Sequence, residues 1–100
     1  MAVVDITQYA SLAVDGSGRQ ISVGMEPCIA NVQVAIGGSS VQSAAFNDNT
    51  RLVRVHTDAA IRIAFGANPT AASTSQRMAA GQTEYFGVRP GEKAAVITTT

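Results

Sequence analysis

Residues 51–66, RLVRVHTDAAIRIAFG, contain two runs of strictly alternating residues on either side of a short polar break. A two-residue period is what a strand with one buried face requires, since successive side chains point to opposite faces. Because the two apolar sides must be buried together, the segment predicts an antiparallel β-hairpin that organises a small core. The side chains on its apolar side are Val53, Val55, Thr57, Ile61, Ile63 and Phe65.

The apolar sides also predict how the two strands of this hairpin pair. If Thr57 lies opposite Ile61, every apolar residue shares one face, whereas a two-residue turn would place Arg62 on the core face. The connection therefore has an odd number of residues, either the three residues 58–60 or a longer loop of the same parity. The same register places His56 across from Arg62.

The other face of the predicted hairpin is basic, because it carries Arg54, His56 and Arg62 without a carboxylate. Like charges across neighbouring strands slightly destabilise a sheet. Two interpretations follow: a solvated face whose acids come from neighbouring strands, or a docking face for an acidic partner surface. Arg54 and Arg62 are therefore candidate partner contacts.

The residue types predict an all-β fold. Besides 17 Ala, the apolar residues include 11 Val and 7 Ile but only 2 Leu, and the chain has a single Lys, a balance that favours strands over helices. The length of 100 residues suits one domain. We expect a β-sandwich or small β-barrel, jelly-roll-like, of about seven short strands. These strands are expected over residues 19–25, 29–36, 41–46, 51–57, 61–66, 83–88 and 93–98.

Turn signals separate the expected strands. Residues 15–18 (Asp-Gly-Ser-Gly) predict a turn rather than a nucleotide-binding loop, since the glycine spacing of such loops is incomplete. Residues 89–92 (Arg-Pro-Gly-Glu) suit a type II turn, which disfavours direct pairing of the strands around it. Tyr85 and Phe86 are adjacent, so a strand sends one into the core and the other outward.

Two segments fall outside this pattern. Residues 1–14 mix small apolar and polar residues and predict an N-terminal arm or an edge strand. Residues 67–82 are rich in Ala, Ser and Thr without a sustained period and predict a long loop, which is either disordered or makes contacts. A brief helical turn or short strand around residues 76–80 would shorten this loop, with Met78 as its anchor.

The sequence gives no sign of catalysis or of a metal or cofactor site. His56 is the only histidine and Cys28 the only cysteine, whereas a structural zinc site needs about four ligands. A buried thiol is the default expectation for Cys28. No nucleophile elbow is present, and the carboxylates show no spacing typical of an acid/base pair. We therefore expect a protein that is not an enzyme and uses no cofactor.

Charge and hydropathy limit the expected partners. Only 14% of the residues are charged and the formal net charge is zero, which argues against a general nucleic-acid binder. No stretch is long and apolar enough for a membrane helix, and the N-terminus lacks a signal peptide pattern. We expect a protein made in the cytoplasm that packs against another protein, not against nucleic acid or a membrane.

The run FNDNTRLVRVHTDAAIRIAFGANPTA, followed by TEYFGVRPGEKAAVI, resembles a recurring signature in small proteins encoded beside the major capsid gene of tailed bacteriophages. The resemblance covers roughly the C-terminal half of the chain and is a pattern of strands and turns without a reactive group. Proteins of this kind are virion structural components, often head decoration (cement) proteins that sit on the capsid surface as trimers and bridge capsid subunits. The resemblance thus implies the virion as the location, the major capsid protein as the partner and a homotrimer as the favoured assembly.

On this hypothesis residues 2–12 add a strand to a capsid sheet edge, and the basic face and the long loop make further contacts. Two other classes stay open: a tail or head-completion component, and a carbohydrate-binding module, although the chain has no Trp. The candidate partner-binding residues are Val3, Val4, Ile6, Tyr9, Arg54, Arg62, Arg77 and Met78.

Overall fold

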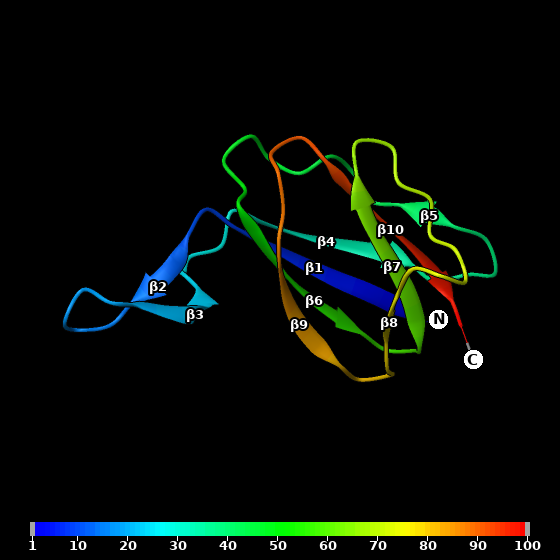
Figure 1. The fold of residues 1–100 in the computed structure, drawn as a ribbon, viewed down its shortest axis with the longest axis horizontal. Coiled ribbons are helices and arrows are strands. Elements are labelled where there is room, and N and C mark those ends of the chain that lie inside the picture. The colour runs from blue at the N-terminus through cyan, green and yellow to red at the C-terminus, as the bar shows by residue number, and fades with distance from the viewer. Residues whose placement is uncertain (1, 100) are drawn as a thin grey trace.

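The computed structural model describes residues 2–99 and confirms the all-β fold (Figure 1). Met1 and Thr100, which the expected domain and arm include, lie outside the described residues. Two four-stranded sheets form a sandwich, and a separate two-stranded hairpin extends from one end. All strand pairs are antiparallel.

The first sheet has the order β4-β1-β6-β9, with bounds Ala30–Ala35, Val3–Tyr9, Leu52–Thr57 and Thr83–Gly87. The second sheet has the order β5-β10-β7-β8, with bounds Val41–Gln42, Lys93–Thr98, Ile61–Gly66 and Gln76–Met78. The separate hairpin pairs β2 (Leu12–Val14) with β3 (Gln20–Gly24). Of these ten strands, β1 and β2 lie in the segment predicted to be an arm or an edge strand, and β8 lies in the predicted long loop, at the position of its short-strand alternative.

The predicted hairpin over residues 51–66 is wrong in its pairing, although both of its strands exist. β6 pairs with β1 and β9 in the first sheet, whereas β7 pairs with β10 and β8 in the second. The chain crosses between the sheets at residues 58–60, so the two apolar sides face each other through the core. Alternation predicts which face is buried, but it does not determine which edges form hydrogen bonds.

The expectation of an N-terminal arm or edge strand is also wrong for residues 3–9. β1 is an inner strand that pairs along its length with β4 on one side and β6 on the other. Val4 and Ile6 are fully buried in the core. The polar residues that alternate with them, Asp5 and Thr7, occupy the outer face of the sheet, so the sequence of this strand is only weakly apolar despite its central position.

The core lies between the two sheets and includes three phenylalanine rings that pack against one another. Phe65 contacts Phe86 at a centroid distance of 4.9 Å and Phe46 at 6.5 Å. Phe86 therefore points inward while its neighbour Tyr85 is exposed, as alternation predicted. The buried residues of the core cluster are Val4, Ile6, Val34, Phe46, Val53, Val55, Ile61, Ile63, Met78, Ala94 and Val96.

A buried amide connects the central strand to the turn before β6. Gln8 on β1 is almost fully buried, and its Oε1 accepts hydrogen bonds from the Asn47 backbone N–H at 2.9 Å and the Thr50 hydroxyl at 2.7 Å. A buried polar group that lacked such partners would destabilise the fold. Gln8 therefore stabilises the contact between β1 and the turn before β6, in keeping with the inner position of β1.

The predicted long loop of residues 67–82 contains β8, so its short-strand alternative is confirmed. Met78 is the expected anchor and is fully buried. The first part of the loop is tied to the region around β5, because the Gln42 side-chain amide donates to Asn68 Oδ1 and to the Pro69 carbonyl, both at 2.8 Å. The Ala71 backbone N–H donates to the Ser40 hydroxyl at 2.9 Å.

The two predicted turns are confirmed. Gly18 has a φ of 83° in the β2–β3 turn and Gly91 has a φ of 76° before β10, where a type II turn requires a positive value. The Glu92 N–H donates to the Arg89 carbonyl at 3.3 Å, which closes that turn. As expected, β9 and β10 do not pair but belong to different sheets.

Candidate functional site

The structure separates the candidate partner-binding residues rather than gathering them. Val4, Ile6, Tyr9 and Met78 are buried and Val3 is half-buried, so these five are unsuitable as exposed contacts. Arg54 lies on the outer face of the first sheet, whereas Arg62 and Arg77 lie on the outer face of the second. The single basic face expected from the hairpin is therefore wrong, because β6 and β7 belong to opposite sheets.

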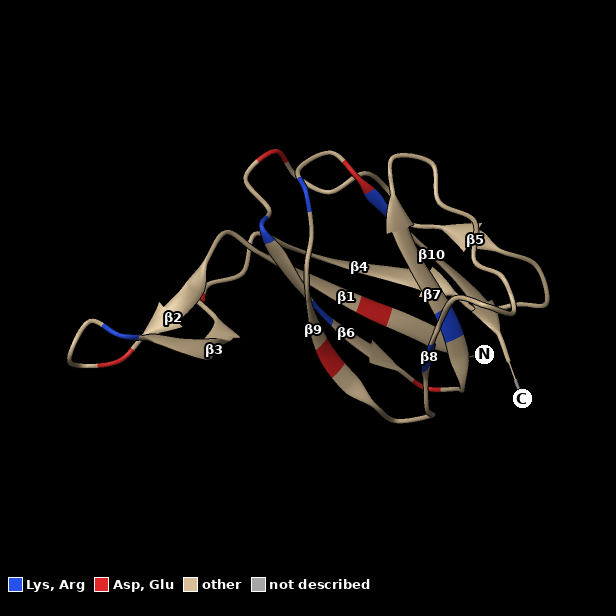
Figure 2. Cartoon of the chain, viewed as in Figure 1, with Lys and Arg blue, Asp and Glu red and all other residues tan. Residues whose placement is uncertain are grey.

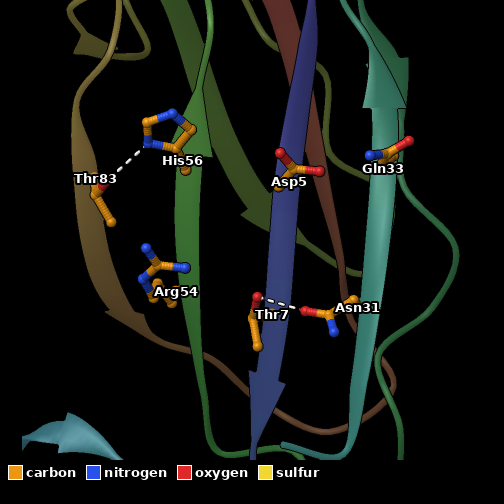
Figure 3. Close-up of a pocket in the computed structure, with 7 residues that line it drawn as sticks. All are labelled: Asp5, Thr7, Asn31, Gln33, Arg54, His56 and Thr83. Atoms are coloured by element: carbon orange, nitrogen blue, oxygen red, sulfur yellow. Dashed lines mark hydrogen bonds between the residues drawn. The ribbon is translucent and has the colours of Figure 1, made fainter.

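The outer face of the first sheet forms an open polar hollow of about 740 Å³ (Figure 3). Asp5 on β1 lies directly opposite His56 on β6, so a neighbouring strand supplies a carboxylate beside the basic residues. This arrangement favours the solvated-face interpretation for Arg54 and His56. The hollow is lined by Asp5, Thr7, Asn31, Gln33, Arg54, His56 and Thr83.

Two side-chain hydrogen bonds order this hollow. The Thr7 hydroxyl donates to Asn31 Oδ1 at 2.6 Å, and His56 Nδ1 lies 2.7 Å from the Thr83 hydroxyl (Figure 3). Nearby, Cys28 is half-buried rather than fully buried as expected, and its Sγ accepts a hydrogen bond from the Asn31 amide at 3.6 Å. Within residues 2–99, no group of three His, Cys, Asp or Glu side chains is placed to hold a metal ion.

The most distinctive surface is the hairpin of residues 11–25, which we call the projecting hairpin. It comprises β2, β3, the turn between them and the flanking pair Ser11 and Met25, and it extends away from the sandwich (Figure 1). Six large apolar side chains are exposed within residues 2–99, and four belong to this hairpin. They are Val14 at 50%, Ile21 at 41%, Val23 at 42% and Met25 at 39% exposure.

Three of these side chains form one row. Ile21 and Val23 alternate along β3, and Met25 follows its last residue in the same alternation, so an extended backbone places all three on one face. An isolated two-stranded hairpin is marginally stable in water. An apolar row on such a hairpin remains exposed to solvent, which is unfavourable, unless another surface covers it. The projecting hairpin therefore has the composition of a contact element rather than of a solvated loop.

The base of the projecting hairpin is fixed to the first sheet by a glycine–tyrosine contact. Gly24 lies against the Tyr9 ring so closely that a Cβ atom at this position would overlap the ring. The Tyr9 hydroxyl donates to the Glu26 carboxylate at 2.7 Å, and the Met25 N–H donates to the Ser11 carbonyl at 3.0 Å. The hairpin thus leaves the sandwich from a fixed base.

A groove of about 510 Å³ separates the projecting hairpin from the end of the first sheet. Leu12, Gln20 and Ser22 line its hairpin side, and Tyr85 and Phe86 line its sheet side. Tyr85 is exposed, and its ring centroid is 6.2 Å from that of the buried Tyr9. The groove and the apolar row lie on the two faces of the same short hairpin.

Burial raises the pKa of the Tyr9 phenol to about 12 from 10.0, and the hydrogen bond and negative charge of Glu26 act in the same direction. Because the folded-state pKa is the higher one, the contribution of Tyr9 to stability is present below pH 10.0 and is lost as the pH rises through about 12. In a Tyr85→Phe variant, where Tyr9 is the only tyrosine, ultraviolet titration should give a midpoint near 12. Glu26→Gln should lower that midpoint, and an unshifted midpoint near 10.0 in Tyr85→Phe would contradict the buried hydrogen bond.

Sequence reasoning missed the projecting hairpin as a surface. The alternation of Ile21, Val23 and Met25 predicted a strand, but a strand in a small domain is ordinarily expected to bury its apolar side. The sequence carries no clear signal for this outcome, because the residues before the turn at 15–18 would allow a long partner strand, whereas β2 spans only Leu12–Val14. So short a pair reaches beyond the main sheets without becoming part of either.

Comparison with protein-family models, with curated proteins and with solved structures finds no match to this chain. Among residues 2–99, no helix is long and apolar enough to cross a membrane.

Proposed function

We propose that this chain is a structural protein without enzymatic activity that docks onto a larger protein assembly through the projecting hairpin. The observation that carries the proposal is the row of Ile21, Val23 and Met25, exposed on an element that extends from an otherwise well-covered sandwich. Exposed apolar side chains gathered on one element are typical of protein contact sites. The low share of charged residues also suits a surface that packs against protein.

The sequence resemblance supports a particular assembly. Because the C-terminal half resembles small proteins encoded beside phage major capsid genes, we propose the outer surface of a phage capsid as the docking site and the major capsid protein as the partner. The chain would be made in the host cytoplasm and become part of the virion. In this role it is a decoration or cement protein that stabilises the shell.

The energetics of the apolar row favour an oligomer. Completing the burial of three side chains that are about two-fifths exposed adds roughly 1 kcal/mol each by the area relation. A total binding free energy of about 3 kcal/mol corresponds to a dissociation constant weaker than millimolar. Several linked hairpins bind more tightly than one because the later contacts are intramolecular. We therefore propose a homo-oligomer, and the resemblance favours a trimer.

The test is to mix the purified protein with capsids that lack it and to measure occupancy and the temperature at which the capsids open. Saturable occupancy and a higher opening temperature are expected. Absence of binding would contradict the capsid proposal. Copy number per virion distinguishes this role from that of a tail or head-completion component, since a shell offers many more sites than a ring.

A carbohydrate-binding module is the second candidate, and the polar hollow of the first sheet favours it. Asp5 offers hydrogen-bond acceptors, Arg54 offers donors, and Asn31 and Gln33 offer both, which suits the hydroxyl groups of a sugar. Binding of the purified protein to a glycan array would support this candidate. An array without signal, together with capsid occupancy, would support the docking role alone.

A further inference from the structure

The outer faces of the two sheets differ in charge although the chain is neutral overall. At the outward strand positions, the first sheet carries Asp5 beside Arg54 and His56. The second sheet carries Arg62, Arg77 and Lys93 at its outward strand positions and no carboxylate there. The blue segments of β7 and β8 lie side by side in Figure 2. One face of a neutral sandwich is therefore cationic.

Arg62 and Arg77 are direct cross-strand neighbours on this face. Residues directly opposite on antiparallel strands have Cβ atoms only about 5 Å apart, and like charges at that spacing destabilise a sheet. Within residues 2–99, neither guanidinium forms an ion pair with a carboxylate. The repulsion between the two positive charges is thus not offset within these residues, and an anion from outside them would offset it.

Arg62 is held in place rather than free to move away from Arg77. Its Nη1 donates to the Ser75 carbonyl at 3.1 Å, and its Nε is covered and has no hydrogen-bond acceptor in residues 2–99. Arg77 is exposed, and the half-buried Ile97 lies on the other side of Arg62. The nearest loop acid in sequence, Asp58, is directed toward the first sheet, because its Oδ2 accepts from the Val3 N–H at 3.4 Å.

We propose that Arg62 and Arg77 together form a carboxylate-binding site that receives an aspartate or glutamate side chain of a docking partner. Guanidinium groups bind carboxylates through paired, charge-assisted hydrogen bonds, and the Arg62 guanidinium is already held in place for such a contact. Phosphate of a nucleic acid is the less suitable anion, since the chain lacks the basic excess typical of nucleic-acid binding. The ligand is therefore an acidic protein surface.

The arginine pair adds a second contact site, far from the projecting hairpin. The projecting hairpin and the β7–β8 pair lie toward opposite ends of a molecule that is 45 Å long (Figure 2). The apolar row and the arginine pair are far enough apart to engage different subunits of one assembly, and a single copy that does so bridges them. This bridging role rests on the proposed docking function, whereas the carboxylate site itself is testable without any capsid.

The test uses hexaglutamate as the probe and hexaglutamine as its neutral counterpart, added to isotope-labelled protein and followed by NMR. Hexaglutamate should give saturable shifts at Arg62, Arg77 and Ile97, and hexaglutamine should give none. Arg77→Gln should weaken hexaglutamate binding by about fivefold or more, since losing one charged contact is worth about 1 kcal/mol. Arg89→Gln, at an exposed position in the turn before β10, is the matched control and should leave the affinity unchanged.

The proposal is overturned if hexaglutamate shifts Arg19 or Arg89 as strongly as Arg77, or if Arg77→Gln binds like the original chain. Tighter binding of a thymidine hexanucleotide at the same two arginines would also overturn it, because the site would then take phosphate. Unchanged peak dispersion in Arg77→Gln shows that the variant is folded. If the peptide binds while capsids do not, the carboxylate site stands and the capsid proposal fails.

Discussion

Replacing Ile6 by Ala should lower the free energy of unfolding by about 2–5 kcal/mol, the usual range for truncating a fully buried isoleucine. Ile6 lies on β1, between β4 and β6, and is completely enclosed by the core. The loss combines the smaller apolar surface with the cavity left between the sheets. Urea denaturation of the purified protein measures this change directly.

The matched control is Val14→Ala on β2, where the side chain is 50% exposed. This change should alter stability by less than about 0.5 kcal/mol, as for most surface substitutions. Comparing the stability of the two variants distinguishes an inner-strand position of residues 3–9 from a peripheral arm. Equal, small effects of both substitutions would show that β1 is peripheral and would contradict the sheet order β4-β1-β6-β9.

Replacing Gly24 by Ala should displace the projecting hairpin from its base. The new Cβ atom would overlap the Tyr9 ring, so either the ring or the hairpin backbone has to move. Overpacking of this kind costs about 1–3 kcal/mol. The Tyr9–Glu26 hydrogen bond should also weaken. Hydrogen exchange of the amides of residues 11–25 should become faster, while exchange within the two four-stranded sheets stays slow.

Two comparisons make the Gly24 result specific. Gly37→Ala is the matched control, because a Cβ atom there meets nothing within 4 Å, and it should leave exchange in the hairpin unchanged. In a Tyr9→Ala background the same Gly24→Ala change should have little further effect, since the ring that it overlaps is gone. Independent, additive effects at the two positions would contradict the contact.

The buried faces of the strands could be predicted from the sequence, but their partners could not. Alternation identified Val53 and Val55 on one strand and Ile61 and Ile63 on the other as core residues, and all four are buried. The same alternation fits a hairpin and two facing strands of a sandwich equally well, because both arrangements bury the same sides. The choice depends on hydrogen bonds to β1 and β10, which are distant in sequence.

Turns were more informative than strand pairing. The pair Pro90 and Gly91 correctly predicted a turn that separates β9 from β10, because proline fixes φ and glycine tolerates a positive value. For the residues of β1 the sequence predicts an arm or an edge strand, because their outward side chains are polar and their inward apolar side chains are few. Only the register with two neighbouring strands reveals that Val4 and Ile6 are central.

The candidate site was predicted only in part. The alternation of residues 61–66 makes Arg62 a candidate contact and the long loop makes Arg77 one, yet their juxtaposition depends on the pairing of β7 with β8. The projecting hairpin was missed as a surface, because exposure of Ile21 and Val23 cannot be read from alternation. Both features depend on contacts between segments that are distant in the sequence, and a single sequence carries little information about such contacts.

The most direct test of the docking proposal is capsid occupancy by the double variant Ile21→Thr and Val23→Thr beside the control Val41→Thr. Val41 is 39% exposed on β5, close to the exposure of Ile21 and Val23, but it lies on the sandwich. The double variant should bind at least about tenfold more weakly, since it loses about 1.4 kcal/mol or more of apolar contact, and Val41→Thr should bind normally. Equal occupancy by all three proteins would contradict docking through the projecting hairpin.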